Sequence, residues 1–126
     1  MRALVYTGTQ LSEIRNLPAP ICDQGQVVVD LAFCGICGSD MHAWHGHDER
    51  RVPPLVLGHE AVGVVNEGLL QGKRVAINPL MTCGACVSCV SWNEHLCEKR
   101  ELIGMREPGA FAEKVAIKTQ NLDNFY

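Results

Sequence analysis

The stretch Cys83-Gly-Ala-Cys86-Val-Ser-Cys89-Val-Ser-Trp-Asn-Glu-His-Leu-Cys97 places four thiols within fifteen residues. Gaps of two, two and seven residues separate these thiols. A tetrahedral Zn²⁺ ion binds thiolates at about 2.3 Å, so its four ligands must converge on one point. Two-residue gaps let the chain turn between ligands, and Gly84 permits the tight backbone of such a turn. Because the protein would fill all four positions, the spacing predicts a structural zinc site at about 83–97.

Two other uses of clustered cysteines compete with zinc. An iron–sulfur cluster also favours C-x₂-C-x₂-C, but the short bacterial run continues with a fourth Cys after three residues and then Pro. Here seven residues precede Cys97, and Glu98 follows it. A disulfide framework is disfavoured because the seven cysteines are an odd number and no secretory signal is expected at Met1–Tyr6. The spacing therefore favours zinc. Cys22 and Cys34, outside this run, are expected to be small buried side chains.

Length and charge exclude several classes of function. A chain of 126 residues is expected to form one domain. The formal charge of −3, without a dense Lys/Arg run, argues against nucleic acid as a partner. No apolar run approaches the roughly 20 residues of a membrane-spanning helix, so no membrane partner is expected. A thiol-rich metal site without a signal peptide points to a reducing cytoplasm.

The rest of the chain predicts many short strands with frequent Gly and Pro between them. A short helix is expected after Ser39, which is placed to cap it, and an extended loop at Arg51–Leu55. Val27-Val28-Val29 should be buried on both faces of its strand. The pattern favours a mainly β barrel or sandwich. The expected strands are residues 1–7 and 11–16, forming a hairpin, then 26–35, 61–65 and 74–77, the last two separated by a turn from Gly68 to Gly72, and finally 111–117.

A second group of chemically capable residues lies upstream, in Gly35-Ile-Cys37-Gly-Ser39-Asp40-Met-His42 and in Gly58-His59-Glu60. Taken singly, each has an ordinary explanation: a core cysteine, a surface histidine or an exposed His-Glu pair. Taken together they supply thiolate, imidazole and carboxylate donors. This is the ligand set of a catalytic zinc ion that keeps an open position.

These motifs resemble the zinc-dependent medium-chain alcohol and polyol dehydrogenase family. The resemblance is carried by Cys37-Gly-Ser-Asp, by Gly58-His-Glu and by the Cys83/Cys86/Cys89/Cys97 spacing, and it is closer to the polyol and threonine dehydrogenases than to the classical liver enzyme. It runs from Met1 to the last residue. It implies a mainly β, GroES-like, partly open barrel with short helices and a Cys₄ zinc lobe.

The resemblance also implies a role for each residue around the catalytic zinc. Cys37 and His59 would be ligands of the ion. Glu60 would be a third ligand, or a nearby carboxylate that moves in during ligand exchange. Asp40 would hydrogen-bond the free ring nitrogen of His59 and so fix its tautomer. Cys83, Cys86, Cys89 and Cys97 would hold the structural zinc.

Proton transfer and substrate binding are implied in the same way. Ser39 would accept the alcohol proton and His42 would relay it toward solvent. Trp44 and His45 would either line the substrate pocket or be a packing Trp and a solvated His. The implied substrate is a small alcohol or polyol, the implied hydride acceptor is NAD(P), and the implied assembly is a homo-oligomer.

Two features limit what this chain is expected to do alone. No G-x-G-x-x-G fingerprint follows a strand in these 126 residues, and the family supplies a further zinc ligand later in its sequence. We therefore expect residues 1–126 to be one barrel domain of a longer enzyme, inactive without its Rossmann domain. The alternative is a zinc-stabilised interaction module without redox chemistry. That function explains the cysteine run but gives no reason for Cys37-Gly-Ser-Asp or Gly58-His-Glu.

Overall fold

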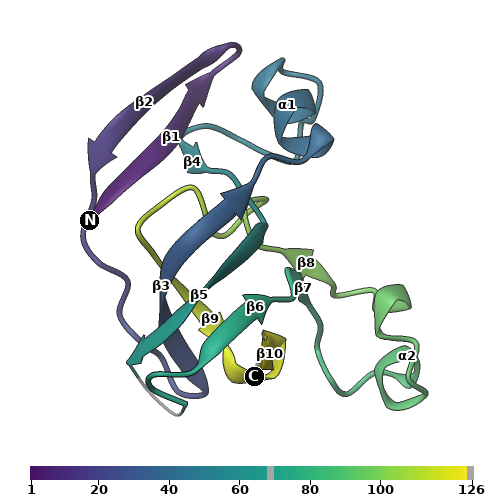
Figure 1. The fold of residues 1–126 in the computed structure, drawn as a ribbon. Coiled ribbons are helices and arrows are strands. Elements are labelled where there is room, and N and C mark those ends of the chain that lie inside the picture. The colour runs from purple at the N-terminus through teal and green to yellow at the C-terminus, as the bar shows by residue number, and fades with distance from the viewer. Residues whose placement is uncertain (68–69, 125–126) are drawn as a thin grey trace.

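The computed structural model describes residues 1–67 and 70–124, and the expectation of a mainly β fold is confirmed (Figure 1). None of the helices among those residues is long and apolar enough to cross a membrane. The strands are β1 (Arg2–Gly8), β2 (Leu11–Asn16), β3 (Gln26–Gly35), β4 (Leu55–Val56), β5 (Glu60–Glu67), β6 (Arg74–Ile77), β7 (Leu80–Met81), β8 (Glu101–Leu102), β9 (Lys114–Lys118) and β10 (Leu122–Asn124). The helical segments are α1 (Gly38–Trp44), α2 (Val87–Val90) and two single 3₁₀ turns, η1 (Glu94–Leu96) and η2 (Thr119–Asn121).

The main sheet has five strands in the order β10-β6-β5-β3-β9, and every neighbouring pair is antiparallel. The register between β3 and β5 shifts twice, between Val28 and Val29 and between Leu31 and Phe33. Such bulges bend a strand and increase its local twist. The sheet therefore curls into the partly open barrel that the family resemblance implied (Figure 1).

The main core consists of buried apolar side chains, most of which belong to this sheet. Its most buried large side chains come from several strands and one loop, namely Val27, Val29, Val65, Val75, Ile103 and Ile117. Val27, Val28 and Val29 are all buried, as the apolar run predicted. Cys22 and Cys34 are only partly buried, so the expectation that both are buried was wrong, although Cys34 packs against the core.

The predicted hairpin forms a second, smaller sheet with β4, in the order β2-β1-β4. Val5 and Tyr6 of β1 pair with the two residues of β4. This pairing anchors the chain immediately before Gly58 and His59. Figure 1 shows α1 near the end of β3, on the same side of the molecule as this smaller sheet.

The cysteine lobe, which we define as residues 83–97, extends away from both sheets in Figure 1. The short antiparallel pair β7 and β8 leads into it and out of it. α2 and η1 belong to this lobe, and both are single turns.

The capping residue of the first helix and the start of the strand expected at 111–117 were predicted wrongly. The residue that caps α1 is Cys37 and not Ser39, because the helix begins at Gly38 and the Asp40 carboxylate accepts the Cys37 backbone N–H at 3.1 Å. The strand expected at 111–117 is β9, which begins at Lys114 and not at Phe111. The Phe111 backbone bonds instead to the carbonyl of Leu57 and the amide of Leu4, which removes it from the β3 ladder. Residues 68–69 of the turn expected from Gly68 to Gly72 lie outside the described residues.

Candidate metal centres

The cysteine centre consists of Cys83, Cys86, Cys89 and Cys97, whose sulfur atoms converge on one point. The Sγ of Cys89 lies 3.9 Å from that of Cys83 and 3.5 Å from that of Cys86, and the Sγ of Cys97 lies 3.6 Å from that of Cys83. Four sulfurs at 2.3 Å from a tetrahedral ion lie about 3.8 Å from one another. A disulfide would need about 2.05 Å. The arrangement therefore fits a bound metal ion and not a set of disulfides.

Local backbone structure explains how the lobe brings these thiols together. Gly84 has φ +69°, a left-handed conformation that suits glycine and turns the chain between the first two ligands. Hydrogen bonds from the backbone N–H groups of Ala85 and Cys86 lower the pKa of the Cys83 thiol to about 6. Burial raises the pKa of the Cys89 thiol. Backbone donors thus already favour one thiolate at the centre without an ion.

The mixed centre consists of Cys37, His59 and Glu60, which offer one donor atom each, all within 4.8 Å of one another. Cys37 follows the end of β3, and Glu60 begins β5. These strands are neighbours, with Gly35 paired to Glu60, so the sheet register brings the two motifs together. Two ligands at about 2.0–2.3 Å from one ion lie at most about 4.6 Å apart, so donors with this spacing are nearly close enough to share an ion.

Asp40 links the two segments that carry these donors. Its side chain is only 2% exposed. One carboxylate oxygen accepts the Cys37 N–H, and the other accepts the Gly58 N–H at 3.2 Å. That second oxygen also lies 3.4 Å from His59 Nδ1, which makes no aligned hydrogen bond to any described residue. His59 thus presents Nδ1 to a carboxylate and leaves Nε2 available to an ion.

Ser39 and His42 lie one helical turn apart on α1 and line the same hollow. The hollow also includes His47 and has a volume of about 720 Å³. His42 is exposed, and its ring centroid lies 5.1 Å from that of His47. Ser39 is partly buried, with its Oγ 3.4 Å from the guanidinium of Arg51.

Trp44 packs against an apolar cluster, as one of its two expected roles requires, and its place in a substrate pocket stays a prediction. Its side chain is half-buried against the apolar cluster of Tyr6, Ala43, Leu55 and Leu57. It also lines an apolar cleft of about 280 Å³ together with Ile36 and Met41. His45 is exposed and meets Trp44 edge to face, with ring centroids 5.0 Å apart, which agrees with a solvated histidine.

Arg51 was not predicted to belong to the site. The sequence places it at the start of a loop before a Pro-Pro pair, and nothing there distinguishes it from its exposed neighbour Arg50. In the structure its guanidinium is buried and contacts Ser39, Asp48 and Gly104. Only the folded arrangement of α1 and the 103–109 loop reveals this environment.

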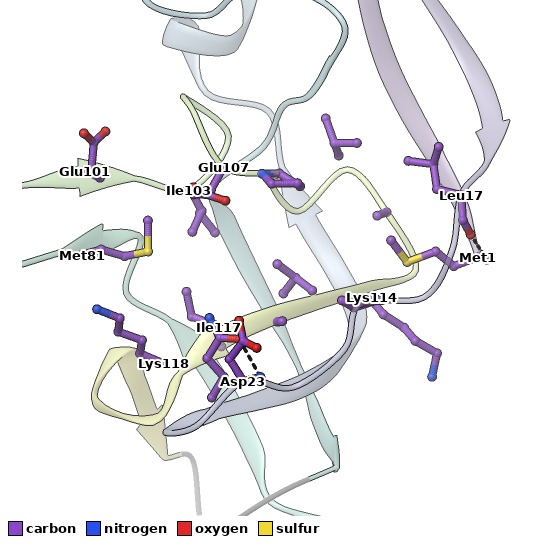
Figure 2. Close-up of a pocket in the computed structure, with 18 of the residues that line it drawn as sticks. Met1, Leu17, Asp23, Met81, Glu101, Ile103, Glu107, Lys114, Ile117 and Lys118 are labelled. Carbon is purple, nitrogen blue, oxygen red and sulfur yellow. Dashed lines mark hydrogen bonds between the residues drawn. The ribbon is translucent and has the colours of Figure 1, made fainter.

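A separate cleft of about 780 Å³ opens beside β9 (Figure 2). Figure 2 shows Met1 and Leu17 at one end, Lys118 and Met81 at the other, and Ile117 between them. The Met1 amino group donates to the Leu17 carbonyl at 2.7 Å. Of the candidate metal ligands, only Cys83 lines this cleft. The cleft is therefore distinct from the mixed centre.

Comparison with known proteins places this geometry in a family. A family model described as the alcohol dehydrogenase GroES-like domain matches residues 23–124. The chain belongs to this family. The resemblance drawn from the Cys37, His59 and cysteine-run motifs is confirmed by that match.

Relatives and solved structures agree with this membership. The chain is 35% identical over 129 residues to a 2-dehydro-3-deoxy-L-galactonate 5-dehydrogenase from Pseudoalteromonas atlantica, covering 97% of this chain and 38% of the relative. It is 36% identical over 115 residues to an L-threonine 3-dehydrogenase from Marinomonas sp., covering 84% and 34%. An Escherichia coli CFT073 protein described as a short chain alcohol dehydrogenase, complexed with NADH, superposes with a TM-score of 0.92 at 30% identity, covering 100% and 38%. The chain thus spans little more than a third of the length of these relatives.

Proposed function

We propose that this chain is the catalytic-zinc domain of an oxidoreductase that interconverts an alcohol or polyol and a carbonyl compound, with hydride transfer to or from NAD(P). The observation that carries the proposal is the convergence of Cys37, His59 and Glu60 within 4.8 Å. A zinc-stabilised interaction module would need only the cysteine centre and gives no reason for this second set of donors. The dehydrogenase names of the relatives support the same class of reaction.

The donor set suits zinc at both centres. Four thiolates make a closed structural site, whereas a thiolate, an imidazole and a carboxylate leave room for substrate. When bound at the mixed centre, zinc would act as a Lewis acid that acidifies a hydroxyl and polarises a carbonyl. Cys37 and His59 would hold the ion. Glu60, which is exposed, would complete the set or exchange with substrate.

The remaining polar residues would position the ligands and move the proton. Asp40 holds the backbone on both sides of the mixed centre and faces His59 Nδ1, so it would keep Nε2 directed at the ion. Ser39 would accept the proton of the alcohol. His42, one turn further along α1 and exposed, would pass it to solvent.

Several finer expectations belong to this proposal. The nicotinamide cofactor would bind in a region beyond the 126 residues, and the chain alone would have no dehydrogenase activity. The NADH in the Escherichia coli structure supports a nicotinamide partner. The protein would form a homo-oligomer. A thiol-rich metal site would suit a reducing cytoplasm.

Cobalt substitution tests the proposal on the chain itself. Co²⁺ takes zinc sites and absorbs visible light in a way that reports thiolate ligation, so titration counts the sites. We expect one tight equivalent at the cysteine centre and a weaker second one at the mixed centre. Cys37→Ser should remove only the second equivalent and Cys97→Ser should disrupt only the first. A single equivalent that Cys37→Ser leaves unchanged would refute a metal site at Cys37 and His59.

A further inference from the structure

Arg51 and Arg50 are adjacent in sequence but differ sharply in environment. The Arg51 side chain is 2% exposed and that of Arg50 is 67% exposed, although both contact the carboxylate of Asp48. A buried guanidinium is costly to desolvate unless its donors are satisfied. The partners of the Arg51 donors therefore indicate what this residue is for.

One end of the guanidinium holds the first turn of α1. Nη1 of Arg51 donates to the Ser39 carbonyl at 3.1 Å, and Nη2 lies 3.4 Å from Ser39 Oγ. Ser39 follows Cys37 by two residues, so these contacts fix the segment that carries the thiol donor of the mixed centre. A hydroxyl has two acceptor lone pairs and one proton. The contact at Oγ occupies one lone pair. The other lone pair can still accept a proton, and the hydroxyl proton can still be donated.

The other end of the guanidinium holds the loop behind the second ligand segment. Nε of Arg51 donates to the Gly104 carbonyl at 3.0 Å. A Cβ at Gly104 would lie 2.8 Å from the Gly58 carbonyl oxygen, and a Cβ at Gly109 would lie 2.3 Å from it. The Ala110 N–H also donates to that oxygen at 2.8 Å. The loop and Gly58, which precedes His59, are thus in direct backbone contact.

We propose that Arg51 is a positioning residue that fixes the distance between the Cys37–Ser39 segment and the Gly58–Glu60 segment. It acts from outside the ion's ligands, through backbone carbonyls on both sides. Asp40 bridges the same two segments from within, through the N–H groups of Cys37 and Gly58. The consequence for metal affinity rests on the proposed function, whereas the effect on the two segments does not.

Amide hydrogen exchange in the metal-free chain tests the positioning role directly. Arg51→Met keeps the apolar stem and removes every donor, and Arg50→Met is the matched control on the same Asp48. In Arg51→Met we expect the amides of Cys37, Gly58 and Gly104 to exchange about tenfold faster or more, with a smaller change in the β3–β9 ladder, because local opening needs less energy than global unfolding. Arg50→Met should leave all of these rates unchanged.

Three results of the exchange experiment would overturn the proposal. They are unchanged rates at Cys37, Gly58 and Gly104, an equal increase at these amides and in the β3–β9 ladder, and an equal response to Arg50→Met. If Arg51→Met does not fold, Arg51→Lys takes its place. Lysine keeps the charge but cannot span Ser39 and Gly104 with one planar fork, so the same three amides should respond.

Cobalt titration of the same variants measures the effect on the mixed centre. Arg51→Met should weaken the second cobalt equivalent about tenfold, as loss of a residue supporting metal ligands typically does. The cysteine centre should keep its affinity and so serves as an internal control, as should Arg50→Met. Equal weakening of both centres would contradict positioning. If the unmodified chain bound no second cobalt, the proposed function would fail, and hydrogen exchange alone would decide the role of Arg51.

Discussion

At the scale of single residues, the cysteines divide by the environment of their sulfur. Backbone N–H donors from Ala85 and Cys86 lower the pKa of the exposed Cys83 thiol to about 6. Burial, followed by the charge of Asp40, raises the pKa of the Cys34 thiol to about 11. At pH 7 Cys83 is therefore mostly thiolate and Cys34 almost wholly thiol. The thiolate is the reactive form.

This difference predicts an order of alkylation. In metal-free protein at pH 7, iodoacetamide should modify Cys83 first and Cys34 among the last, as measured by mass spectrometry of peptides over time. Zinc should protect Cys83, because a metal-bound thiolate is not free to react, and should leave Cys34 unaffected. Raising the pH toward 11 should accelerate Cys34 far more than Cys83. Equal rates for the two thiols at pH 7 would contradict the assigned environments.

The residue types of the candidate site could be predicted from sequence, but their supports could not. Cys37, His59 and Glu60 were singled out because thiolate, imidazole and carboxylate are the donors zinc uses. Their convergence depends on the pairing of β3 with β5, which a single sequence does not specify. Arg51 was missed because its burial arises from contacts with residues 12 and 53 positions away. No local pattern encodes such contacts.

At the scale of elements, the pairing of β3 with β5 depends on a close backbone approach at Gly63. A Cβ at this position would lie 2.2 Å from the Asp30 carbonyl oxygen and 2.7 Å from a methyl group of Val29. Both neighbours belong to β3, and the Asp30 oxygen cannot move without disturbing the ladder. Glycine inside a strand commonly marks such an approach.

Gly63→Ala is therefore expected to lower the free energy of unfolding by about 1–3 kcal/mol, the usual cost of overpacking. Urea denaturation followed by circular dichroism measures the change. Gly38→Ala is the control, since a Cβ there would meet no atom within 4 Å. Alanine is also a better helix residue than glycine, so this control should be neutral or slightly stabilising. A Gly63→Ala midpoint equal to that of the unmodified chain would contradict the packing.

Strand positions could be predicted where the apolar pattern is local. The predictions failed where contacts with residues far away in sequence decide the backbone pairing. The β1–β2 hairpin, β3 and β6 were placed correctly from β-branched runs and turn residues. Phe111 was assigned to a strand from its composition, yet its backbone bonds to Leu4 and Leu57, which lie far away in sequence. The cap of α1 was misplaced because Ser39 is the better capping residue type, while the geometry selects Cys37.

At the scale of the whole molecule, the barrel and the cysteine lobe are stabilised differently. The barrel has an apolar core of valine and isoleucine side chains from four strands and the 103–109 loop. Within the lobe, residues 83–97, all of which the structure describes, the buried side chains are those of Cys89 and Cys97. The apolar residues of this segment, including Val87, Val90 and Trp92, are exposed, with Trp92 at 92%. The lobe thus has no hydrophobic core of its own.

Metal removal should therefore unfold the lobe and spare the barrel. Because ion binding supplies the folding free energy of small metal-held segments, a strong chelator should raise amide exchange across residues 83–97 while residues 26–35 stay protected. Mass spectrometry of exchanged peptides resolves the two regions. Cys97→Ser should reproduce the chelator effect with zinc present, whereas Cys22→Ser, outside the lobe, should behave like the unmodified chain. Loss of protection in β3 at the same chelator concentration would mean that barrel and lobe unfold as one unit.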